Sequence, residues 1–190
     1  MTDPKEQDYA DSGLSIQYAI NDYYTRCPEK RGTGILWAGR RISTADKIEV
    51  PRMGLVRGEF LSADPTVRQG FDLNVPKGWI ELPGGERVAL LRTWRDQRLE
   101  DVVEYSFYSP TGVLWVWNVY EMSYPSGRKV VEKWTHNAGM WVETVGECER
   151  IYHCSHGMAD PPDFCCLVFR VSITPQESRR GRKPTRPRSQ

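Results

Sequence analysis

The chain has 190 residues, of which 27% are charged and 39% hydrophobic, and its formal net charge is +1. This length is enough for one domain with a hydrophobic core and is short for two. Mean hydropathy is −0.59 and no apolar run reaches the length of a membrane span, so we expect a soluble protein with no membrane partner. The charged N-terminus lacks the apolar core of a secretory signal. This favours an intracellular protein, nuclear or cytoplasmic, whose cysteines stay reduced.

Composition divides the chain into three parts. Residues 1–12 are polar and predict a disordered N-terminus, residues 13–174 predict a single β-rich domain, and residues 175–190 predict a basic, disordered tail. Residues 179–190 hold six cations and no acid, so residues 1–178 carry a formal charge of −5. An acidic body therefore bears a basic tail.

Residues 14–24 predict a short helix near the N-terminus. Asp11 or Ser12 precedes the segment and is positioned to cap it. We expect the helix to brace the sheet through four apolar side chains at helical spacing: Ile16, Ala19, Ile20 and Tyr23.

Residues 100–145 predict the centre of a β-sheet. Ser-Pro-Thr-Gly at 109–112 and Tyr-Pro-Ser-Gly at 124–127 have the proline and glycine positions of type I turns. We expect four strands joined by hairpins here. Residues 113–122 belong in the middle of the sheet, because Trp115 and Trp117 alternate with Leu114 and Val116 and make both faces apolar. Further strands are expected at 35–37, 48–61 (one bent strand or two short ones), 79–82, 87–94, 151–154 and 165–173.

The strand pattern predicts an all-β fold. An antiparallel up-and-down meander of this size avoids long exposed edges by closing as a small barrel or by stacking as a β-sandwich. As architecture alone, it resembles the calycin group that includes lipocalins, and this resemblance implies an internal ligand cavity. Five aromatic residues are candidates to line such a pocket: Trp94, Tyr105, Trp115, Trp117 and Trp134. These rings are equally suited to fill a core.

Cysteine and histidine gather between positions 136 and 166. Zinc needs four converging ligands, and a structural site would form if the chain folds back between His156 and Cys165. The candidate ligands are Cys148, Cys154, His156 and Cys165, although cysteine at the start of an apolar strand also serves as a small hydrophobic residue. We expect no other cofactor.

The tail carries the one motif with a known binding partner. Arg179-Arg180-Gly181-Arg182-Lys183-Pro184 resembles the AT-hook, whose Arg-Gly-Arg-Pro core lies in the minor groove of AT-rich DNA. Lys183 interrupts that core, and the same cations suit a nuclear-localisation signal or a non-specific nucleic-acid tether. The candidate residues are Arg179, Arg180, Arg182, Lys183, Arg186 and Arg188.

These observations favour a non-enzymatic regulatory or accessory protein, of the kind that cells and viruses both encode. Its β domain would bind a macromolecular partner, while the tail would direct nuclear entry or hold nucleic acid. The alternative is a small-molecule-binding barrel with an aromatic-lined pocket, acting as an isomerase, cyclase or lyase. No P-loop, dinucleotide turn, zinc-protease helix or nucleophile elbow is present, so we predict no catalytic residue.

Overall fold

The computed structural model describes residues 7–97 and 101–176. Most of this part of the chain is β-strand, as the sequence predicts. The helices are α1 (Ile16–Arg26) and two short 3-10 turns, Pro28–Lys30 and Arg95–Gln97. None of the helices described is long and apolar enough to cross a membrane.

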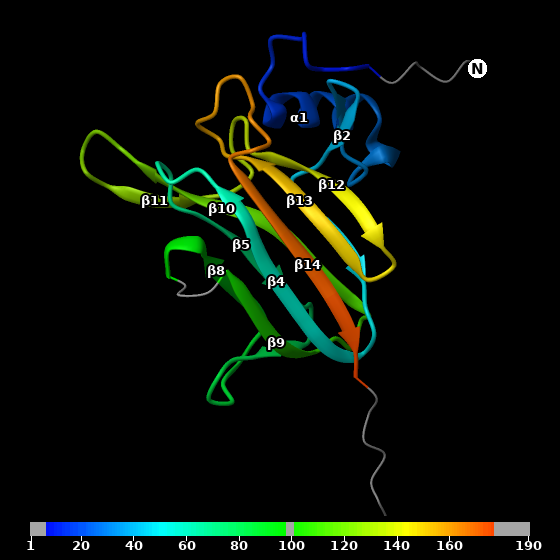
Figure 1. Ribbon diagram of the computed structural model, residues 1–190. Helices are drawn as coiled ribbons and strands as arrows, with labels where there is room; N and C mark the ends of the chain where they lie inside the picture. The colour runs from blue at the N-terminus through cyan, green and yellow to red at the C-terminus, as the bar shows by residue number, and fades with distance from the viewer. Residues whose placement is uncertain (1–6, 98–100, 177–190) are drawn as a thin grey trace, which may run out of the picture.

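Most strands belong to two antiparallel sheets that face each other as two layers, and two further strands form a separate two-stranded sheet (Figure 1). The seven-stranded sheet has the order β12 (Gly139–Gly146), β13 (Glu149–Ser155), β14 (Leu167–Pro175), β4 (Met53–Ala63), β9 (Val102–Tyr108), β6 (Trp79–Glu81) and β7 (Arg87–Val88). The five-stranded sheet has the order β11 (Lys129–Glu132), β10 (Val113–Ser123), β5 (Gln69–Asn74) and β8 (Leu90–Trp94), with β3 (Asp46–Glu49) also paired to β10.

One hydrophobic core lies between the two sheets and draws residues from both. Phe71 on β5 stacks on Phe169 of β14 with ring centroids 4.5 Å apart, and Tyr152 of β13 stacks on the same Phe169 at 4.7 Å. A polar link joins the same layers, because the Tyr152 hydroxyl donates to Asp46 Oδ2 of β3 at 2.8 Å. The two sheets therefore fold as one unit.

The predicted barrel is not formed. Among the strands described, no pairing joins the two ends of either sheet, so the calycin-like alternative is corrected to two facing sheets. The meander is also interrupted. Of its predicted hairpins, β10 and β11 do pair, but the turns after β9 and after β11 carry the chain to the opposite sheet.

The physical reason is that alternation specifies which residues face the core and does not specify which strand pairs at the edge. Phe107 of β9 and Leu114 of β10 both point into the core, one from each layer. Ser109 holds the corner between them, because its hydroxyl bonds both the N–H and the carbonyl of Val113. The chain changes sheets again after β7, so the predicted strand 87–94 is two strands in different layers.

Helix α1 packs at one end of the sandwich, on a hairpin of β1 (Ile35–Trp37) and β2 (Arg40–Ile42) (Figure 1). Its four predicted core residues are buried. The predicted cap is corrected, because the helix begins after Ser15 and its first N–H groups bond elsewhere: Ile16 N donates to Asn137 Oδ1, and Gln17 N donates to the His136 carbonyl. A remote segment thus caps the helix.

The segment that precedes α1 belongs to the folded domain from Asp8 onward. Tyr9 is 1% exposed and its N–H donates to the Leu36 carbonyl, while the Asp8 carboxylate accepts from the N–H groups of Ala38 and Gly39 at 2.8 Å. The hydrogen bond from the Ala10 N–H, and then those from Gly39 and Ala38, lower the pKa of Asp8. A buried aromatic ring and a hydrogen-bonded carboxylate together hold this segment on the β1–β2 hairpin.

The close approach of the two sheets can be tested by a substitution at Gly58 of β4. A Cβ atom there would lie 2.5 Å from Cζ of Phe71 on the facing sheet, so Gly58→Ala should destabilise the protein by about 1–3 kcal/mol through overpacking. Gly146→Ala is the control, because no atom lies within 4 Å of the position that a Cβ would take there, and it should leave stability unchanged or slightly raised. Urea unfolding of both variants measures the difference. Equal midpoints would contradict the proposed contact.

Candidate functional site

The outer side of the five-stranded sheet carries a cluster of tryptophans that we call the tryptophan face: Trp94, Trp115, Trp117 and Trp134. The strand register sets its layout. Trp94 on β8, Gly70 on β5 and Val119 on β10 form one row across the sheet, and the next row holds Arg92, Asp72 and Trp117. Gly70 has no side chain, so the larger groups of its row come from the flanking strands.

Asp72 is the polar centre of the tryptophan face. Its carboxylate is fully buried, and both of its oxygens accept from Arg92 at 2.8 Å. Asp72 Oδ2 also accepts from the indole N–H of Trp117 at 3.0 Å. A buried carboxylate is tolerated only when it is paired and hydrogen-bonded, and this one is. Arg92 and Trp117 are therefore held in fixed positions.

Cations lie over the rings of the tryptophan face. The Arg68 guanidinium lies 4.3 Å from the ring centroid of Trp94. Lys133 Nζ lies 4.3 Å from the ring of Trp134 and 4.9 Å from that of Trp117, and these two rings meet edge to face at 5.5 Å. Cation–π contacts of this kind attract the ammonium to the ring faces.

Trp134 has an unusual backbone. Its φ is +56°, in the left-handed region where a bulky side chain costs about 1–2 kcal/mol, yet its indole is 39% exposed. Trp94 and Trp117, in contrast, are 8% and 7% exposed. The strained conformation places the most accessible indole of the tryptophan face at its rim.

The outer side of the seven-stranded sheet has a different chemistry. Arg170 lies between Glu59 and Glu149, with both N–O distances 3.3 Å. This side also carries aromatic rings, because Trp141 stacks on His153 at 3.8 Å and Trp79 lies against Tyr108 at 6.0 Å. The tryptophan face differs because it gathers four indoles around one buried carboxylate, and an apolar surface rimmed by polar groups is typical of an interaction site.

The structure separates the five residues predicted to line an internal pocket. Tyr105 lies in the core between the sheets, whereas the four tryptophans lie together on the outer face. The four tryptophans therefore do not line a cavity between the sheets. The sequence analysis missed Asp72, Arg92 and Lys133. Asp72 could have been noticed in the sequence, because it is the one charged residue of β5, and most residues of that strand are buried.

The candidate zinc ligands do not converge. Cys148 precedes β13 and His156 follows it, so the length of the strand, roughly 25 Å, separates them. Cys154 is buried in the core and Cys165 is exposed. Within the described residues, no three His, Cys, Asp or Glu side chains form a group that could hold a metal ion. Burial raises the pKa of the Cys154 thiol well above its ordinary value, so it acts as a small core residue.

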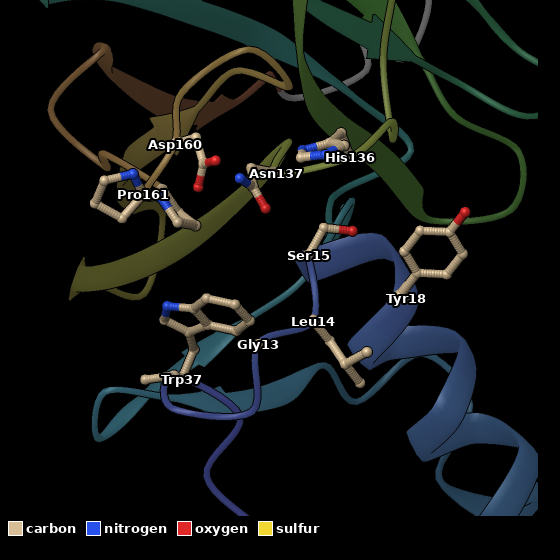
Figure 2. A pocket seen from close by; sticks show the side chains of 11 residues that line it. Gly13, Leu14, Ser15, Tyr18, Trp37, His136, Asn137, Asp160 and Pro161 are labelled. Atoms are coloured by element: carbon tan, nitrogen blue, oxygen red, sulfur yellow. The ribbon is translucent and has the colours of Figure 1, made fainter.

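A pocket of about 580 Å³ opens beside the N-terminal end of α1 (Figure 2). Three parts of the chain surround it: the helix region with β1, the His136–Asn137 segment, and the connection from β13 to β14 that carries Asp160. The Ser15 hydroxyl is buried and has no hydrogen-bond partner among the described residues. Ser15 and His136 are therefore not coupled as a nucleophile and its base would be.

The six tail cations, Arg179 to Arg188, lie outside the described residues, and their role stays a prediction. Comparisons with protein-family models, with curated proteins and with solved structures found no match to this chain. Function is therefore argued from the chain's own residues.

Removal of the Asp72 carboxylate should be costly. Asp72→Ala leaves Arg92 without its partner and Trp117 without an acceptor, and we expect a loss of about 3 kcal/mol in unfolding free energy. The control is Glu81→Ala, which breaks a solvent-exposed pair with Arg87 and should cost less than about 1 kcal/mol. Denaturant unfolding compares the two. Similar losses in unfolding free energy would show that the buried Asp72 network stabilises the fold no more than an exposed ion pair does.

His156 should make stability depend on pH. Burial lowers its pKa, against the opposing effect of Asp64 and Asp163, and its Nδ1 accepts from the Met158 N–H. The fold thus favours neutral His156, so its contribution is full above the unfolded pKa of about 6.5 and is lost as pH falls toward the lower folded value. The slope it adds is at most about 1.4 kcal/mol per pH unit.

His156→Gln should therefore flatten the fall in stability between about pH 7 and about pH 5. The wild-type protein, measured in the same buffers, is the reference. Thermal unfolding across this range reports both. A His156→Gln profile parallel to that of the wild type would rule out the role of this imidazole.

Proposed function

We propose that this protein is a non-enzymatic accessory protein that binds single-stranded nucleic acid. In this proposal the tryptophan face stacks bases and the basic tail neutralises phosphates. The tail also suits a nuclear-targeting signal, which would bring the protein to such a partner.

The tail supports the electrostatic half of the proposal. Six cations with no acid in residues 179–190 can release counterions from a polyanion, whereas the acidic body cannot do so as a whole. Affinity that depends on salt would then come chiefly from the tail.

The tryptophan face supports the stacking half. Proteins that hold single strands combine aromatic platforms with nearby cations, because every base has a π-face. Trp134 is exposed at the rim, Lys133 lies beside it, and Lys47 is exposed on β3, where it pairs in register with Trp115. The acids of this region are compensated: Glu121 pairs with Arg68 and with Lys129.

The strained backbone of Trp134 is the observation that most directly supports the proposal. Backbone strain persists where the surrounding structure enforces it, and it concentrates at binding sites. A flexible single strand can lay an unpaired base on this indole, whereas a duplex keeps its bases stacked inside.

Trp134→Gly tests this directly. Glycine adopts the positive φ without strain, so the variant should keep its fold, yet its affinity for a labelled single-stranded oligonucleotide should fall about tenfold in fluorescence anisotropy. The control is Trp79→Ala on the seven-stranded sheet, a half-buried indole that also carries a cation, Arg87, at 4.0 Å. We expect it to bind as the wild type does.

Removal of residues 179–190 should change the salt dependence of binding, which Trp134→Gly should not change. The salt dependence of binding, as log affinity against log salt, should lose about four units of slope if all six cations contact phosphates. Trp134→Gly should leave the slope unchanged. Wild-type affinity in Trp134→Gly, or tighter binding to duplex than to single strands, would overturn the stacking role.

A further inference from the structure

The pocket beside α1 is unrelated to the tryptophan face and has its own chemistry. At about 580 Å³ it falls in the size range of small-molecule sites. Its walls come from segments far apart in the sequence, so it exists only in the folded chain. Figure 2 shows Trp37 and Tyr18 on the side of the helix and hairpin, and Asp160 with Pro161 across from Trp37.

The charge of the lining favours a cation. Asp160 is the only carboxylate, and there is no lysine or arginine, among the lining residues; its side chain is exposed and makes no hydrogen bond or ion pair with the described residues. The nearby end of α1 is not an anion site. The N–H groups of Ile16 and Gln17 that would bind an anion already donate to Asn137 Oδ1 and the His136 carbonyl.

The aromatic walls favour a flat apolar body. Trp37 is 8% exposed and fixed in the core beneath α1, whereas Tyr18 is 66% exposed and projects from the helix. Leu14 and the two prolines, Pro161 and Pro162, complete the apolar lining. Indole and phenol rings attract cations as well as flat rings.

We propose that this pocket binds a small protonated amine with a flat, apolar body. Asp160 pairs with the ammonium group, and Trp37 and Tyr18 contact the body of the ligand. Asn137 shapes the pocket and is held in place, because its side chain accepts from Ile16 N and donates to the Ala159 carbonyl.

Three probes with one ring and different charges test the proposal: tryptamine (cation), indole (neutral) and indole-3-propionate (anion). In isothermal titration calorimetry with the full-length chain, tryptamine should bind more tightly than the other two. Asp160→Asn should weaken the affinity for tryptamine at least tenfold, equivalent to about 1.4 kcal/mol, and leave the affinity for indole unchanged. Asp11→Asn removes an exposed carboxylate that does not line the pocket and should change neither.

Two further variants locate the bound probe. Tyr18→Ala removes a mostly exposed wall, so the fold should survive, and it should weaken both tryptamine and indole several-fold. Trp79→Ala should bind tryptamine as the wild type does, because Trp79 lies on β6 and does not line the pocket. Equal affinity for all three probes, preference for indole-3-propionate, no heat from tryptamine at millimolar concentration, or wild-type affinity in Asp160→Asn would each overturn the proposal.

Discussion

The contact of aromatic rings between the two sheets is the constraint on which the rest of the structure depends. Phe71 lies against Phe169 and, in a tilted arrangement at 5.1 Å, against Phe60, so one ring of the five-stranded sheet is held by two strands of the other. Gly58 permits this approach because it offers no Cβ. Stacked rings bury large areas and restrict the relative position of the layers. The relative position of the two layers therefore also fixes where their two outer faces lie.

Once the inner faces are fixed, the outer faces can serve different purposes. The seven-stranded sheet carries ion pairs together with two separate aromatic pairs. On the five-stranded sheet, the buried carboxylate of Asp72 holds Trp117, while Trp134 is the exposed indole. Burial of that carboxylate is expensive and its ion pair offers little net stability, so its value lies in fixing Arg92 and Trp117. Stable positions for large side chains are what a binding surface requires.

Helix α1 closes the end of the sandwich through contacts that also form the pocket beside its N-terminal end. The segment His136–Asn137 caps the helix, and Asn137 reaches the connection that carries Asp160. A cap made by a remote segment couples the helix to the sheet, because neither end of the contact is satisfied without the other. The pocket walls are consequently held by the same hydrogen bonds that hold the helix.

Much of the fold followed from the sequence, because alternation and turn residues act locally. Most strand positions, the helix and its buried stripe, and the opposite faces of Trp117 and Val116 are properties of neighbouring residues. Strands β2 and β5 were not predicted, although β5 carries both Phe71 and Asp72. The assignment of strands to layers did not follow. β9 and β10 are consecutive and share a tight turn, yet each pairs with strands distant in sequence.

The sequence by itself determined which side chains share a face and where the tail charge lies. Only the tertiary structure decided that the tryptophans lie outside the sandwich, that the zinc candidates are apart, and that Asp160 lies across a pocket from Trp37. The reason is physical: side-chain period is set by the local backbone, whereas partners across a sheet or a pocket are chosen by the burial of the whole chain.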